Sequence, residues 1–136
     1  NYSNHEKCSI PNHEYMIGGF STIYMSRNRV RPWDKPSFTI QAGGRHAPIH
    51  PQAPEMIAIR QNKKIFNLHK KYQKKNRDIL YRRLSVRECA RIQTFPDDFI
   101  FKYENVSDGY TMIGNAVAID FAEILAKKIY EDLNLR

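Results

Sequence analysis

Two stretches of this chain place apolar residues three and four positions apart, with polar residues between them. The longer stretch is at the carboxyl end, where the apolar stripe consists of Ala118, Phe121, Ala122, Leu125, Ile129 and Leu133. Glu123 and Lys127 lie four residues apart on the other side, a spacing that allows an ion pair. The pattern predicts an amphipathic carboxy-terminal helix.

A shorter helical pattern, over residues 85–95, has both of its ends marked. Ser85 followed by Glu88 is a capping-box pair, which satisfies two backbone N–H groups at a helix start. Pro96 disfavours the helical conformation at Phe95, so we expect the helix to stop there. At helical spacing Val86, Cys89, Ala90 and Gln93 fall near one another, with Arg87 and Arg91 on a common edge.

The upstream half has the pattern of strands and turns. Residues 20–26, which follow Gly18 and Gly19, are β-branched and aromatic, and residues 37–42 alternate in polarity, so both stretches are predicted strands. Gly43 and Gly44 permit a turn that needs positive φ, and Arg45 follows them.

Three arginines, Arg27, Arg29 and Arg31, occupy alternate positions after the first predicted strand. On an extended backbone, alternation places their side chains on one face. That face is either a solvated basic edge or a reader of guanine, because a guanidinium can donate twice to O6 and N7 of one base. The spacing leaves both interpretations open.

Charge narrows the choice of partner. The 136 residues include 22 Lys and Arg against 14 Asp and Glu, a formal charge of +8, and residues 60–83 are the most basic segment. A polyanion is therefore expected as partner, nucleic acid before an anionic membrane. No apolar stretch is long enough to span a bilayer, and no signal segment is recognisable.

The remaining candidate chemistry is sparse. Cys8 and Cys89 form no paired framework, which favours a reducing compartment. His5, Cys8 and His13 are loosely spaced, whereas a structural zinc site normally has four ligands, so we interpret them as loop residues and predict no metal. The chain begins at Asn1 rather than Met, so we expect it to be a segment of something longer.

The 83–99 stretch closely resembles the ninth conserved block of the DNA cytosine-C5 methyltransferases, and Gly114-Asn115-Ala116-Val117 resembles the tenth block, which follows it. The family transfers a methyl group from S-adenosyl-L-methionine (AdoMet) to C5 of cytosine in double-stranded DNA. The resemblance implies that the tenth-block helix lines part of the AdoMet pocket, with Asn115 and Ala116 as contacts. Ala118 stands where the family usually has proline.

Residues 20–54 are similar to the target-recognition region of the branch of this family that modifies GGCC. The similarity is carried by the run from Ser21 to Trp33, by residues 36–45 and by His50-Pro51-Gln52-Ala53-Pro54. It implies that Arg27, Arg29 and Arg45 contact guanines and that Ile23 inserts where the DNA rearranges around the extruded cytosine. With Arg31 from the alternating series, these are the predicted DNA-binding residues.

The catalytic blocks are missing from this sequence. The family nucleophile is a cysteine that follows proline, and the chain contains no Pro-Cys pair. The glycine-rich AdoMet block and the arginine pair of the eighth block are absent too. Glu104-Asn105-Val106 matches the sixth block in letters, but it lies in the wrong place, in what looks like a turn, so we assign no catalytic residue. We expect the chain alone to be inactive.

Together these features predict an α+β chain in three parts: a linker over residues 1–17, an irregular β-rich recognition region over 18–83, and a helical segment over 84–136. The helices are expected to pack on an AdoMet-dependent, Rossmann-like catalytic domain, in the same longer chain or in a separate subunit, within a bacterial cytoplasmic restriction-modification system. Without that domain, the last helix should expose apolar surface. The alternatives are a stand-alone DNA-binding module that has lost the catalytic core and a generic basic RNA-binding protein.

Overall fold

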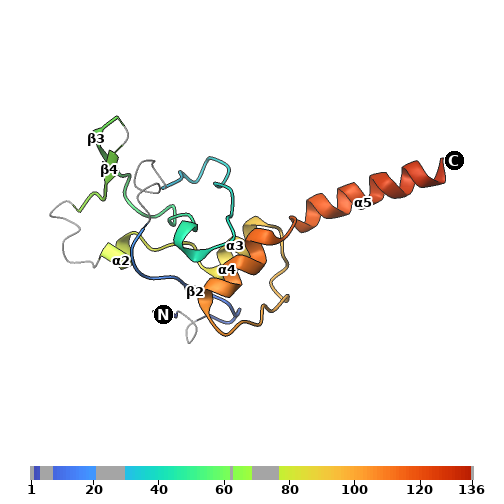
Figure 1. The fold of residues 1–136 in the computed structure, drawn as a ribbon, viewed down its shortest axis with the longest axis horizontal. Coiled ribbons are helices and arrows are strands. Elements are labelled where there is room, and N and C mark those ends of the chain that lie inside the picture. The colour runs from blue at the N-terminus through green and yellow to red at the C-terminus, as the bar shows by residue number, and fades with distance from the viewer. Residues whose placement is uncertain (1, 4–7, 21–29, 62, 69–76, 136) are drawn as a thin grey trace.

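The computed structural model describes residues 2–3, 8–20, 30–61, 63–68 and 77–135. The upstream half is mostly irregular and the downstream half is helical (Figure 1). The described strands form two antiparallel pairs, β1 (Tyr2–Ser3) with β2 (Glu14–Tyr15) and β3 (Ile57–Arg60) with β4 (Lys63–Ile65). In chain order the short helix η2 (Gly44–His46) lies between β2 and β3, and α2 (Arg77–Leu80) follows β4. This content is compatible with the predicted α+β class.

The main core forms where α3 (Val86–Ile92) and α4 (Val106–Asn115) pack together. Its buried residues are Ile40, Ala47, Leu84, Val86, Cys89, Ala90, Phe101, Val106, Tyr110 and Ile113. Ile40 and Ala47 come from the upstream loops, so those loops are fixed against the helices by burial of apolar surface rather than by a sheet.

A second cluster holds the upstream region together. It consists of Val30, Ile49, Ala53, Met56 and Tyr81, with Phe20, Phe66 and Leu80 packed against it. Isolated backbone bridges join Ile49 to Val30 on one side and to Arg83 on the other. Three segments distant in sequence therefore meet at one almost fully buried isoleucine.

The capping box predicted at the start of the 85–95 helix is present in α3. The Ser85 hydroxyl accepts from the Glu88 N–H at 3.1 Å, and the Glu88 carboxylate accepts from the Ser85 N–H at 2.8 Å. The helix ends at Ile92, three residues before the predicted stop at Phe95. Thr94 adopts φ 58°, a left-handed conformation that terminates a helix before the proline acts.

The predicted strand over residues 37–42 does not form. The alternation is real, since Ile40 is buried between exposed neighbours, but no strand of the described chain lies beside it to supply ladder hydrogen bonds. The turn that Gly43 and Gly44 permit is present and leads into η2, but it does not use the left-handed conformation, which among the described glycines Gly18 adopts, at φ 116°. Gly44 is instead required by close packing, because a Cβ there would lie 2.7 Å from the Tyr110 ring.

The stretch expected to be a turn at Ser107–Gly109 is the first part of α4. Asn105 caps this helix by accepting from the Asp108 N–H at 3.1 Å, so the Glu-Asn-Val letters mark a helix start. Asn115 is the last residue of α4 rather than the opening of the final helix. Residues 106–115 did not look helical in the sequence because they contain Gly109 and Gly114, and glycine is a poor helix former.

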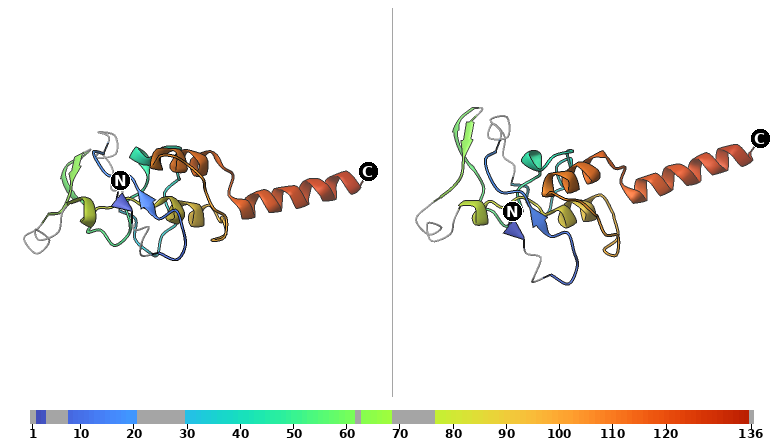
Figure 2. Two further views of the ribbon diagram at one scale, coloured as in Figure 1. Left: turned by 90° about the horizontal axis from the view of Figure 1, so that it is seen from below. Right: turned by 60° about the horizontal axis from the view of Figure 1, so that its bottom comes forward.

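The final helix, α5 (Ile119–Asn134), projects away from the rest of the molecule, and the hairpin β3–β4 stands at the opposite end (Figures 1 and 2). The predicted Glu123–Lys127 ion pair is present. No residue of α5 is buried, which confirms the expected exposure of its apolar stripe. The helix is held at its start, where the Ile119 N–H donates to the Gln93 carbonyl (3.1 Å) and the Asp120 N–H to Thr94 Oγ1 (2.9 Å).

Candidate functional site

Two of the five predicted DNA-contacting residues can be located. Ile23, Arg27 and Arg29 lie outside the described residues, so their predicted roles stay predictions. Arg45 is exposed on η2, immediately after the close contact of Gly44 with Tyr110. The packing of Gly44 against α4 therefore fixes the backbone from which Arg45 extends.

Arg31 is folded over its own loop. Its Nε donates to the Pro36 carbonyl at 2.7 Å, and its guanidinium lies over the Phe38 ring, 4.8 Å from the centroid. The hydrogen bond closes the Arg31–Pro36 loop, and the cation–π contact orients the guanidinium plane. One edge of Arg31 is thus used for structure, which leaves the terminal nitrogens as its possible contacts with a partner.

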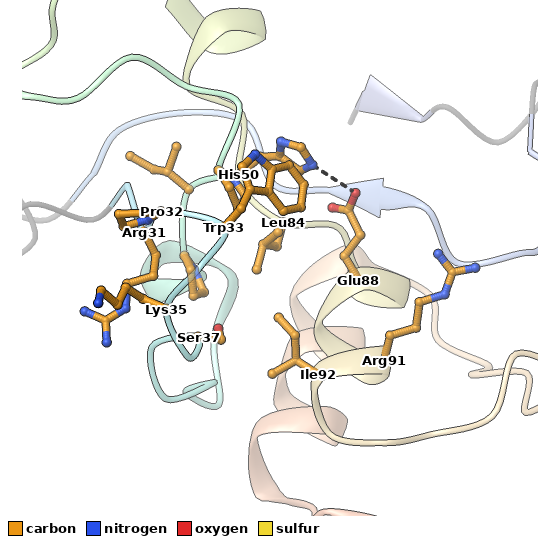
Figure 3. Close-up of a pocket in the computed structure, with 13 residues that line it drawn as sticks. Arg31, Pro32, Trp33, Lys35, Ser37, His50, Leu84, Glu88, Arg91 and Ile92 are labelled. Carbon is orange, nitrogen blue, oxygen red and sulfur yellow. Dashed lines mark ion pairs between the residues drawn. The ribbon is translucent and has the colours of Figure 1, made fainter.

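The same loop forms one wall of a pocket of about 380 Å³. Arg31, Lys35 and Ser37 come from the loop, and Glu88, Arg91 and Ile92 come from α3 on the opposite side (Figure 3). Pro48, Ile49, Pro51 and Leu84 make the remaining wall apolar. The pocket thus joins the predicted recognition region to the ninth-block helix, with cationic side chains from both sides.

Trp33 and His50 form one end of this pocket. The indole is 71% exposed and meets the imidazole edge-on, with ring centroids 5.4 Å apart. His50 Nδ1 accepts from the Gln52 N–H at 3.2 Å, so Nε2 carries the proton and faces Glu88 Oε1 at 3.7 Å. Burial, reinforced by the nearby Arg82 charge, lowers the pKa of His50. The histidine is therefore neutral near pH 7 and acts as a packing partner for Trp33.

Glu88 is the most heavily used polar group of the site. Arg82 donates to both carboxylate oxygens, at 2.7 and 2.8 Å, beside the capping hydrogen bond from Ser85. Burial by itself would raise the pKa of Glu88, but these donors outweigh it and hold the pKa at about 2. The carboxylate is ionised at neutral pH and fully engaged, so its role is to position α3 and not to transfer protons.

Two buried arginines connect the segments around the site. Arg83 donates to the carbonyls of Met16 (3.0 Å), Gly18 (3.3 Å) and Gly19 (3.0 Å) and lies 4.0 Å from the Phe20 ring centroid. It thereby fixes the chain that enters the predicted recognition residues. A basic sequence pattern gives no sign of this, because buried and solvated arginines look alike in sequence.

Arg87 has no exposed surface. It donates to the carbonyls of Pro11 (3.1 Å), Pro96 (3.1 Å) and Phe99 (2.7 Å). Arg91 lies four residues further along α3, on the predicted common edge, but its surroundings differ: it is at the surface and makes a two-pronged ion pair with Asp97, at 2.7 and 2.8 Å. The ninth-block arginines divide between an internal tie and a surface pair.

Neither cysteine offers a reactive thiol of the kind that the family reaction needs. Cys89 is fully buried in the main core, and burial raises the pKa of its thiol. Cys8 is free and half-buried. In the described part of the chain no group of three metal-ligating side chains comes together, and the His13 ring lies 3.3 Å from the Ser85 hydroxyl; His5 lies outside that part.

Asn115 and Ala116, the predicted AdoMet contacts, lie at the joint between α4 and α5. Asn115 is exposed and Ala116 is half-buried, and neither lines the pocket described above. Their roles toward AdoMet therefore stay predictions. None of the described helices is long and apolar enough to cross a membrane.

A positively charged chain with arginines on packed loops is typical of proteins that bind nucleic acid. Comparison with known proteins identifies the family. The model of the C-5 cytosine-specific DNA methylase family matches residues 1–131, and the chain belongs to that family.

Three similar relatives are named as Type II methyltransferases. The chain is 64% identical over 133 residues to M.MthTI of Methanothermobacter thermautotrophicus and 54% identical over 133 residues to M.FnuDI of Fusobacterium nucleatum. M.NgoPII of Neisseria gonorrhoeae is 49% identical over 125 residues. These matches cover 98%, 98% and 92% of this chain but only 38%, 37% and 35% of the relatives. The chain thus spans little more than a third of the length of these relatives.

Proposed function

We propose that this chain is the DNA-recognising, carboxy-terminal part of a cytosine-C5 methyltransferase of a restriction-modification system, acting on GGCC in double-stranded DNA. The observation that carries the proposal is the match of nearly the whole chain to the methylase family over little more than a third of its relatives' length. The Pro-Cys nucleophile is absent from this sequence, so the catalytic groups come from outside it, in the same polypeptide or in a second subunit.

Recognition rests on arginines carried by packed loops. In this proposal Arg27, Arg29 and Arg45 donate to guanine O6 and N7, Arg31 contributes beside them, and Ile23 fills the space left by the extruded cytosine. The anchoring of Arg45 behind Gly44 supports this role, because a base-reading side chain needs a fixed backbone. The similarity of residues 20–54 to the GGCC branch of the family also supports the proposal.

The cofactor is S-adenosyl-L-methionine, which supplies the methyl group when bound. In this proposal Asn115 and Ala116 are the contacts that this chain contributes to its site. The exposed apolar side of α5 supports a catalytic domain as the missing neighbour, since Phe121, Leu125 and Ile129 are between 49% and 60% exposed. A module selected to work alone would be expected to bury or remove such a stripe, which disfavours the stand-alone alternative.

Binding and methyl transfer test the proposal separately. The purified chain, titrated against a GGCC duplex and a scrambled duplex at several salt concentrations, should prefer GGCC after the electrostatic part has been screened. Equal binding that collapses with salt would contradict the GGCC assignment to this chain alone.

In an assay of methyl transfer, the chain by itself should transfer no labelled methyl group from S-adenosyl-L-methionine to DNA. It should do so when mixed with the part of M.MthTI that the match does not cover, because the remaining catalytic blocks would then be present. Methylation by the chain alone would overturn the proposal, and methylation of another sequence by the mixture would overturn GGCC as the target.

A further inference from the structure

We propose that the β3–β4 hairpin is a second DNA contact, which binds the phosphate backbone of duplex flanking the target and contributes affinity without sequence preference. This inference rests on the proposed function, since it takes double-stranded DNA as the partner. The hairpin lies at the end of the molecule away from α5 (Figures 1 and 2).

The hairpin has a fixed base and an unburied body. Met56, directly before β3, is buried in the second cluster, and Phe66, directly after β4, packs against Tyr81 with ring centroids 4.5 Å apart. Tyr81 also accepts from the Asn67 N–H at 2.7 Å. In contrast, all four residues of β3 are exposed. The hairpin therefore adds little to the core, although the packing of its flanking residues fixes its orientation on the second cluster.

The body of the hairpin carries uncompensated positive charge. Arg60 stands opposite Lys63 in the strand register, and Lys64 follows. Like charges directly opposite each other destabilise an antiparallel pair, and an isolated two-stranded hairpin is marginal in water. Among the described residues no acidic side chain forms an ion pair with any of the three.

The sequence between Glu55 and Asp78 offers no compensation either. The segment from Met56 to Arg77 contains eight Lys and Arg and no Asp or Glu. A bound polyphosphate backbone would remove the cross-strand repulsion and supply the missing negative charge. Because Lys and Arg on an exposed ribbon can neutralise phosphates of any sequence, this contact supplies affinity and orientation rather than specificity.

The test removes the three charges together. In the variant Arg60→Gln, Lys63→Gln, Lys64→Gln the slope of log affinity against log salt should fall by about 2.7, at about 0.9 per phosphate contact. Between about 50 and 200 mM salt the parent chain should then lose about 40-fold more affinity than the variant. The ratio of affinities for GGCC and scrambled duplexes should not change.

Two controls isolate the hairpin. The first, called the α5-side control, is Lys102→Gln, Lys127→Gln, Lys128→Gln. It removes the same charge from α5 and from the loop before α4, and it should keep the parental slope. The charge-preserving variant Arg60→Lys, Lys63→Arg, Lys64→Arg should keep it as well. Shortening both flanks of the duplex should weaken the parent chain and the two controls but leave the triple-glutamine variant nearly unaffected.

The outcomes separate the inference from the proposed function. An unchanged slope in the triple-glutamine variant, or an equal fall in the α5-side control, would overturn the hairpin contact while leaving GGCC recognition intact. Loss of GGCC preference in that variant, with the circular dichroism of the parent, would also overturn it, because the hairpin would then be reading bases. Absence of any duplex binding by the parent chain would overturn both.

Discussion

At the scale of single residues, the arginines of this chain have three different uses that depend on their surroundings. Arg87 is an internal tie for carbonyl groups, Arg82 neutralises a half-buried carboxylate, and Arg45 extends into solvent. An arginine is suited to internal use because its five donors can satisfy several carbonyls at once. Formal charge therefore overstates the number of side chains available to DNA.

Replacing Arg87 by alanine should destabilise the chain strongly. The part-buried carbonyls of Pro11, Pro96 and Phe99 would lose their donor, and a hydrogen bond to a charged group contributes about 1.5–3 kcal/mol. Chemical denaturation should show a loss of at least about 3 kcal/mol. The matched variant Arg91→Ala breaks a surface ion pair and should cost less than about 1 kcal/mol. Equal losses in the two variants would contradict the buried role of Arg87.

Glu88 should make the free energy of unfolding depend on pH in the acid range. Its pKa is about 2 in the folded chain and about 4.5 without its partners, so its contribution is complete above pH 4.5 and is lost as the pH falls toward 2. The lost stability is about 3 kcal/mol for a pKa difference of this size. Burial also lowers the pKa values of His13 and His50. Because the unfolded chain then binds protons more readily than the folded chain, stability should begin to fall as the pH drops below about 6.5.

The variant Glu88→Gln isolates the carboxylate, because both histidines remain. It should be less stable than the parent at pH 7 and should lose less of its free energy of unfolding between pH 4.5 and pH 2.5. The exposed residue Glu104 provides the control, since Glu104→Gln should follow the parent curve. Parallel curves for the parent and Glu88→Gln would show that the Arg82–Glu88 pair does not set the acid response.

At the scale of elements, α4 organises the site more than the predicted strands do. Its Tyr110 hydroxyl donates to the Leu84 carbonyl, its Gly109 lies beneath Tyr103, and its Gly114 meets the loop at Gln41–Ala42. The upstream loop is thus shaped by contact with a helix. This explains why residues 37–42 alternate in burial without forming a ladder.

Gly114→Ala should separate α4 from that loop. A Cβ at this position would lie 2.3 Å from the Ala42 backbone nitrogen, so the backbone would have to move. Overpacking of this kind costs about 1–3 kcal/mol, and the thermal midpoint should fall accordingly. Gly19→Ala is the matched control, because nothing lies within 4 Å of its added Cβ. A midpoint unchanged by Gly114→Ala would show that the contact is not close in solution.

At the scale of the whole molecule, the chain has a packed body from which one helix, α5, projects. The main core is closed around α3 and α4, whereas α5 leaves it after two hydrogen bonds from its first turn. A sixteen-residue helix with no buried residue gains nothing from the core it is attached to. Its apolar stripe is therefore a surface for a neighbour, which in our proposal is the catalytic domain.

Leu125→Asp with Ile129→Asp should separate folding from assembly. Both side chains are about half exposed, so the free energy of unfolding of the chain should change by less than about 0.5 kcal/mol. Methyl transfer reconstituted with the unmatched part of M.MthTI should be lost. Glu131→Gln, on the polar side of α5, should keep it. Full reconstitution by the double variant would exclude this stripe as the contact.

Local sequence determined the features that depend on a few neighbouring residues. The capping box at Ser85 and Glu88 and the amphipathic final helix with its Glu123–Lys127 pair were predictable, because caps and helical periodicity are local. The methylase family was equally accessible, since the ninth and tenth blocks are short continuous motifs. The early end of α3 was missed because Thr94 has no sequence mark for its left-handed conformation.

Tertiary structure decided everything that joins distant segments. Gly44 and Gly114 are glycines because α4 packs against the upstream loops, and Trp33 meets His50 because the second cluster brings Val30 and Ile49 together. The burial of Arg87 likewise depends on carbonyls 76 positions before it and 12 after it. Such contacts arise from the close packing of surfaces far apart in sequence, so no periodicity or local motif could announce them.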